Sequence, residues 1–138
     1  MNIEECFQKK LLKKVAPDLL KARNSLSIAE KKLERAQELL LDDFFAEAFI
    51  TAYTAMFHTA RSVLYKDGIQ EKGHYAVYVY ISEKYSGKIS SSLIEAFYAY
   101  QSERHKLLYG FEDDSSKEEV NSIIDYAEQL LEEVRKFV

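Results

Sequence analysis

The stretch AYQSERHKLLYGFE, residues 99–112, carries two neighbouring side chains that could take part in catalysis. Arg104 keeps its positive charge at any physiological pH, so it can hold a phosphate or a carboxylate. Histidine, here His105, is the side chain that most readily exchanges a proton near neutral pH. Consecutive residues of a helix point about 100° apart, however, whereas an acid–base pair needs converging side chains. We therefore expect that Arg104 and His105 do not form a catalytic pair within one helix.

Arg104 also interrupts an apolar stripe. A helix expected at about residues 91–109 places Leu93, Phe97 and Tyr100 on its core face, and Arg104 continues that face. Burying a guanidinium without a partner costs several kcal/mol. We therefore expect Arg104 to meet a carboxylate, backbone carbonyls or a solvent-filled cleft.

A second polar feature lies on the long apolar segment that precedes this helix. Its members recur every three or four residues, as Glu47, Thr51, Thr54, His58 and Arg61 or Ser62. Such a stripe is either the solvent side of a helix or a polar seam that faces a partner helix or subunit. His58 on this stripe and His74 further along are each interpreted first as structural histidines, with a catalytic role as the alternative.

Other signatures of catalysis are missing from the sequence. It has no glycine-rich phosphate loop, no His-Glu-x-x-His and no Gly-x-Ser-x-Gly. The single cysteine, Cys6, excludes an internal disulfide, and no Cys/His spacing suggests a zinc site. The sequence therefore predicts neither a metal nor a cofactor.

The elements that must position these residues are helices. Four glycines and one proline in 138 residues leave few turn formers, which favours long helices joined by short loops. Apolar spacing and capping residues predict a short first helix ending near Lys14, and further helices at about 19–40, 42–65, 74–85, 91–109 and 115–137. The segment HYAVYVYISEKYSG has strand-like alternation but no second strand to pair with, so it is interpreted as the short helix at 74–85.

We expect one all-α domain spanning residues 1–138, an up-and-down bundle of about four main helices with a short N-terminal helix and a short inserted helix. A net charge of -4 argues against a surface coated in positive charge for duplex DNA. The sequence shows neither a signal peptide nor a run of about 20 apolar residues that could cross a membrane, which predicts a cytoplasmic protein.

Two stretches together resemble a known family. The segment AYTAMFHTARSVLYKDGIQEKGH, residues 52–74, is similar to the YYAMFHAARALL…G…SH motif of HEPN-domain proteins, in particular the small stand-alone group associated with minimal nucleotidyltransferases. The later RHKLLYG, residues 104–110, resembles the arginine and Tyr-Gly ending of that group's fourth helix. The resemblance implies a helical bundle that forms a homodimer and acts with a minimal nucleotidyltransferase in a toxin-antitoxin-like or stress system.

In nuclease members of that family, an arginine and a histidine separated by four to six residues are apposed across the dimer and cleave RNA without a metal. Arg104 matches the arginine, but the three positions allowed for the histidine are Tyr109, Gly110 and Phe111. A free tyrosine hydroxyl loses its proton only at about pH 10, so tyrosine is a weak base at neutral pH. Phe111 also replaces a tyrosine to which a partner enzyme attaches nucleotides in some toxin members, and Tyr109 would be the nearest substitute.

Three hypotheses follow from the sequence. The first is a nuclease-impaired homodimer that binds RNA or nucleotides through Arg104, Tyr109 and the polar stripe. The second is an active metal-independent endoribonuclease in which Arg104 works with Tyr109 or with one of His58, His74 and His105. The third is a purely structural dimerisation bundle in which Arg104 forms a salt bridge to Glu47 or another acid.

Overall fold

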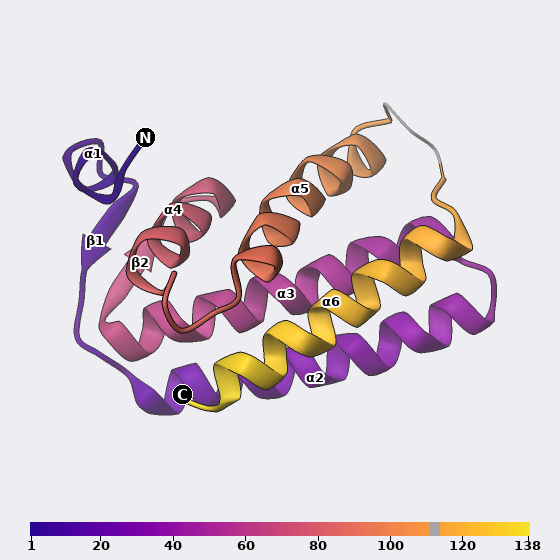
Figure 1. Ribbon diagram of the computed structural model, residues 1–138, viewed down its shortest axis with the longest axis horizontal. Coiled ribbons are helices and arrows are strands. Elements are labelled where there is room, and N and C mark those ends of the chain that lie inside the picture. Colours follow the sequence, from indigo (N-terminus) through magenta and orange to yellow (C-terminus); the bar gives the residue numbers. More distant parts are fainter. Residues whose placement is uncertain (111–113) are drawn as a thin grey trace.

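The computed structural model describes residues 1–110 and 114–138. Within them the chain is mostly helical, as the sequence predicts, and the long helices α2, α3 and α6 lie side by side along the length of the molecule (Figure 1). The elements in chain order are α1 (Ile3–Gln8), β1 (Leu12–Lys14), α2 (Leu19–Leu41), α3 (Phe45–Asp67), β2 (Ile69–Glu71), α4 (His74–Lys84), α5 (Ser91–Leu108) and α6 (Lys117–Arg135).

Helix α3 is the centre of the bundle, because it packs against α2, α4, α5 and α6. Its partner α2 begins after Asp18, whose side chain accepts a hydrogen bond from the backbone N–H of Lys21. The buried residues of α2 alternate between large and small, with Ala22, Leu26, Ala29, Leu33 and Ala36 along one stripe. Small residues at alternate turns let the two helix backbones approach closely, which explains the extensive α2–α3 contact.

The ends of two helices follow the sequence signals. Gly68 ends α3 in the left-handed conformation, with φ 73°. A Cβ atom at this position would lie 2.6 Å from the carbonyl oxygen of Val15, so no larger residue fits. Helix α6 begins with a capping box, in which Ser116 and Glu119 bond each other's backbone N–H.

The N-terminal segment differs from the sequence prediction. The first helix ends at Gln8 rather than near Lys14, because Lys10 adopts a left-handed conformation with φ 61°. The chain then forms β1, which pairs antiparallel with β2 and aligns Leu12 with Glu71. Strands of three residues are too short to show an alternating pattern, which is why the sequence did not reveal them.

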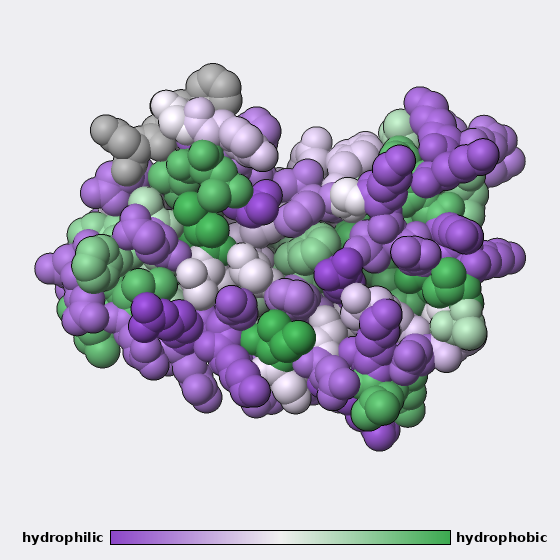
Figure 2. All heavy atoms as spheres, turned by 180° about the vertical axis from the view of Figure 1, so that it is seen from behind, coloured by the Kyte–Doolittle hydropathy of each residue, from purple (hydrophilic) through white to green (hydrophobic). Residues whose placement is uncertain are grey.

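Hydrophilic side chains dominate the face of the molecule seen in Figure 2, and apolar residues appear there as separate patches. No helix in the described part of the chain combines the length and apolarity that a membrane span requires. Over the same residues, no group of three or more His, Cys, Asp or Glu side chains is placed to hold a metal ion.

Candidate functional site

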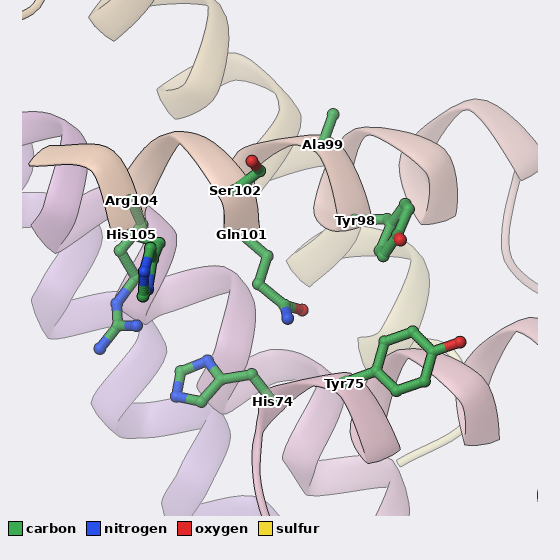
Figure 3. Close-up of a pocket in the computed structure, with 8 residues that line it drawn as sticks. All are labelled: His74, Tyr75, Tyr98, Ala99, Gln101, Ser102, Arg104 and His105. Carbon is green, nitrogen blue, oxygen red and sulfur yellow. The ribbon is translucent and has the colours of Figure 1, made fainter. Parts of the chain in front are cut away.

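A pocket of about 570 Å³ lies between α5 and the start of α4. Its lining consists of polar and aromatic residues, namely His74, Tyr75, Tyr98, Ala99, Gln101, Ser102, Arg104 and His105. Arg104 and His105 lie at one end, Tyr75 and Tyr98 lie at the other, and His74 and Gln101 lie between them (Figure 3). The pocket therefore presents a cationic end and an aromatic end to the same cavity.

Arg104 meets a cleft and an aromatic ring rather than an acid. It is half-buried, and its guanidinium carbon lies 5.5 Å from the centre of the Tyr53 ring on α3. Among the residues that the structure describes, no carboxylate forms a salt bridge with Arg104. The cation–π contact orients the side chain but does not neutralise its charge. Of the three environments that the sequence allowed for Arg104, the structure shows the cleft.

His74 is the first residue of α4 and is held by aromatic neighbours from α3. Its Nδ1 atom and the hydroxyl of Tyr53 share a hydrogen bond of 2.9 Å, and its ring stacks on that of Phe57 with centres 4.0 Å apart. Burial, together with the positive charges of Arg104 and Arg61, lowers the pKa of His74 to about 4. His74 is therefore neutral at pH 7 and adds no positive charge to the pocket.

Burial also raises the pKa of the Tyr53 hydroxyl, although the nearby charge of Arg104 acts in the opposite direction. Tyr53 thus stays protonated at neutral pH. Its ring stacks against that of Phe97 on α5, with centres 5.7 Å apart, and this contact anchors α5 to α3 beneath the pocket. Tyr53 and His74 form a neutral, hydrogen-bonded floor for the guanidinium of Arg104.

Arg104 and His105 border the same pocket although they contact different groups. Arg104 packs on Tyr53 from the core side, while His105 is exposed and its ring lies 4.5 Å from that of Tyr109. The expected divergence of the two side chains therefore does not prevent both from facing one ligand. Helix geometry alone indicated that the two side chains diverge, but the structure places both at the border of one pocket.

Residues 22–137 match the HEPN domain family. The chain belongs to the HEPN domain family. Among curated proteins, the chain is similar to "Putative toxin MJ0605" of Methanocaldococcus jannaschii, with 29% identity over 116 residues, 80% of this chain and 84% of that protein. The helical architecture and the motif stretches read from the sequence agree with this assignment.

The positions at which the sequence resemblance leads one to expect a histidine, residues 109–111, are only partly described. Tyr109 is the residue that follows α5, is 67% exposed and is not among the pocket-lining residues. Gly110 follows it with φ 79°, and Phe111 lies outside the described residues. The predicted phosphate-binding role of Tyr109 therefore stays a prediction, because its side chain does not converge with Arg104 in the described pocket.

The polar stripe of α3 does not line the pocket of this HEPN domain. Glu47 is exposed, Thr51 is half-buried, and the Thr54 hydroxyl donates to the carbonyl oxygen of Ile50 on its own helix. His58 is half-buried, and burial together with Arg61 and Lys32 lowers its pKa. No described contact joins this stripe to Arg104.

Arg61 shows what a paired arginine looks like in this chain. Its Nε atom lies 2.8 Å from Oε1 of Glu71, an ion pair whose geometry falls short of an aligned hydrogen bond. Its guanidinium carbon also lies 5.4 Å from the centre of the Phe57 ring. Arg104 shares the aromatic contact but lacks the carboxylate among the described residues, so its charge is available for an anion that enters the pocket.

Sequence reasoning missed several pocket-lining residues as site residues, namely Tyr75, Tyr98, Gln101 and Ser102. It also missed the buried Tyr53, which contacts His74 and Arg104. The spacing of Tyr98, Gln101, Arg104 and His105 at three- and four-residue steps could have revealed one wall. Tyr53 and Tyr75 come from other helices, and only packing brings them to the site.

Proposed function

We propose that this HEPN protein is a homodimer that binds RNA or nucleotides in the cytoplasm, with a phosphate group held at Arg104, and that it is impaired as a nuclease. The observation that carries the proposal is Arg104 itself, half-buried at the end of a pocket and without a carboxylate partner in the described part of the chain. A charge-assisted hydrogen bond from the guanidinium to a phosphate oxygen would supply the missing counter-charge.

Impaired cleavage is inferred from the groups that surround Arg104. Metal-independent RNA cleavage needs a base that removes the proton of a ribose 2′-hydroxyl and an acid that protonates the leaving 5′-oxygen. With a pKa of about 4, His74 is a weak base, and its Nδ1 atom is already bonded to Tyr53. Tyr109 stands where the family's histidine is expected, and its exposed hydroxyl lies outside the pocket lining.

One observation favours a second candidate function, an active endoribonuclease. His105 lines the same pocket as Arg104, so it can reach a ribose whose phosphate is bound there. In this reaction the 2′-oxygen forms a bond to phosphorus while the bond from phosphorus to the 5′-oxygen breaks. His105 would take the proton of the 2′-hydroxyl and, once protonated, deliver it to the leaving 5′-oxygen, while Arg104 would stabilise the charge that develops on the phosphoryl oxygens.

Incubation of structured and single-stranded RNA with the purified protein in EDTA separates these candidates. The proposed function predicts RNA binding that Arg104→Ala weakens, with no cleavage above the level of a buffer control. Cleavage abolished by both Arg104→Ala and His105→Ala would establish the nuclease instead. Binding that Arg104→Ala leaves unchanged would contradict both candidates and favour a structural bundle.

We also propose that the protein works with a minimal nucleotidyltransferase in a toxin-antitoxin-like or stress system. The family assignment and the similarity to a protein described as a putative toxin support this placement. A gene for a minimal nucleotidyltransferase beside the gene for this chain, and a stable complex of the two purified proteins, are the expected results. If no such gene lies beside the gene for this chain and the two purified proteins form no complex, the proposed partnership is wrong.

The proposed homodimer has a separate test. Light scattering on the purified chain should give twice the monomer mass. A monomer at the concentrations used for RNA binding would refute the dimer, while leaving the role of Arg104 to be judged by the binding experiment.

A further inference from the structure

Three tyrosines form a cluster at the aromatic end of the pocket. Tyr98 on α5 stacks against Tyr78 on α4, with ring centres 4.3 Å apart and an angle of 20° between the rings. Tyr75 lies 6.1 Å from Tyr78 and 6.2 Å from Tyr98, measured between ring centres. We call Tyr75, Tyr78 and Tyr98 the tyrosine cluster. Tyr75 and Tyr98 line the pocket directly, and Tyr98 is 44% exposed.

Tyr98 leaves part of its ring open at the pocket, and a flat ligand can stack on an exposed aromatic face. Tyr78 packs beneath Tyr98 and holds its ring in place, so Tyr98 offers a supported aromatic surface rather than a freely rotating side chain. The cluster therefore has the form of a stacking platform.

The pocket also holds an unused hydrogen-bond acceptor. Oε1 of Gln101 is buried and has no hydrogen-bond partner among the described residues. Its side chain projects into the space between Arg104 and Tyr98 (Figure 3). A buried polar atom without a partner is costly, and a ligand that donates a hydrogen bond here would remove that cost.

These groups are spaced over a distance that one nucleotide can span. Tyr98, Gln101 and Arg104 follow one another at three-residue steps on α5, so the first and last are separated by about 9 Å along the helix axis. A nucleotide can bridge that distance from its base to a neighbouring phosphate. We propose that the pocket selects unpaired nucleotides of single-stranded RNA: one base stacks on the tyrosine cluster, its polar edge bonds the amide of Gln101, and the phosphate binds Arg104.

This inference rests on the proposed function and sharpens its substrate class. Bases in duplex RNA are stacked on each other and hidden from side chains, whereas unpaired bases can be splayed onto aromatic rings. Every base has a flat aromatic face, so stacking alone tolerates different sequences. The amide of Gln101 would add a preference for bases that carry an exocyclic amine at the edge it meets.

Fluorescence anisotropy with three labelled RNAs tests the inference: a short single strand, the same strand with abasic sites, and a blunt duplex. Stacking of one base predicts that Tyr98→Leu weakens binding of the single strand by roughly 5- to 150-fold. Tyr98→Phe keeps the ring and should bind like the wild type. Phe44→Leu removes an exposed aromatic ring on the α2–α3 turn, outside the pocket, and serves as the matched control.

The abasic strand provides an independent measurement that needs no variant. The wild type should bind it more weakly than the intact strand, and Tyr98→Leu should not weaken it further, whereas Arg104→Ala should weaken both strands. Equal binding of all three RNAs, with Tyr98→Leu unchanged and Arg104→Ala weakened, would overturn the inference and leave the proposed function standing.

Two other outcomes count against the proposals. If Arg104→Ala has no effect on any of the RNAs, the proposed function fails, and the inference fails with it. If Tyr98→Leu changes the molecular mass in light scattering but not the preference for intact over abasic RNA, the tyrosine cluster is a protein interface and the inference is wrong.

Discussion

Replacing His74 by asparagine should make the fold less sensitive to acid. Burial and the charges of Arg104 and Arg61 lower the pKa of His74 from 6.5 to about 4, so the folded state resists its protonation. In the unfolded chain the histidine takes up a proton as the pH falls below about 6.5. Stability is therefore highest above that pH and decreases as the pH falls from about 6.5 towards 4.

The magnitude follows from the same two values. A change in pKa from 6.5 to about 4 corresponds to a contribution of about 3.4 kcal/mol to the free energy of unfolding, present in full above pH 6.5. About 2 kcal/mol of this contribution is lost by pH 5. Because His74 is only half-buried, solvent screening reduces this loss to about 1 kcal/mol.

The assay is urea unfolding followed by circular dichroism at about pH 7.5 and pH 5, at one protein concentration so that any association is held constant. Asparagine keeps an acceptor near the position of Nδ1, so the Tyr53 hydroxyl retains a partner while the titration disappears. The loss of unfolding free energy between the two pH values is subtracted, variant from wild type, so that the contributions of the other titrating groups cancel. Equal losses in the two proteins would refute the reasoning.

Three further predictions concern stability at neutral pH and are measured by the same unfolding assay. The carboxylate of Asp67 accepts hydrogen bonds of 2.8 Å from Tyr80 and 2.6 Å from Tyr85, so Asp67→Ala should cost about 2 to 4 kcal/mol, and a loss below about 1 kcal/mol would contradict this. Gly68→Ala combines a positive φ with a clash against backbone and should cost more than about 1 kcal/mol; an unchanged midpoint would disprove it. Ser116→Ala removes the cap of α6 and should cost about 1 kcal/mol, whereas Ser116→Asp should restore most of the loss.

The helical architecture was predictable because its signals are local. The capping box at Ser116, the glycine stop at Gly68 and the alternating stripe of α2 each depend on residues within a few turns of one another. The small sheet was not predictable in this way. Its strands are three residues long and pair Leu12 with Glu71, which are far apart in the sequence.

Only part of the candidate site could be predicted from the sequence. Arg104 stood out because a permanent charge interrupted an apolar stripe, and this observation needed no structure. The neutral state of His74 could not be foreseen, because it depends on Tyr53 and Phe57 from another helix and on charges at residues 61 and 104. The shared pocket of Arg104 and His105 likewise depends on how α4 packs beneath α5.

The dissociation constant of a single-stranded RNA, compared between the wild type and Arg104→Ala, tests the central claim most directly. Loss of a charged hydrogen bond to phosphate predicts binding weaker by roughly 10- to 150-fold. Arg35→Ala is the matched control, since Arg35 is exposed on α2 and paired with Glu38. Binding weakened by Arg104→Ala but not by Arg35→Ala is the predicted result. Equal affinities for the wild type and Arg104→Ala would contradict the account.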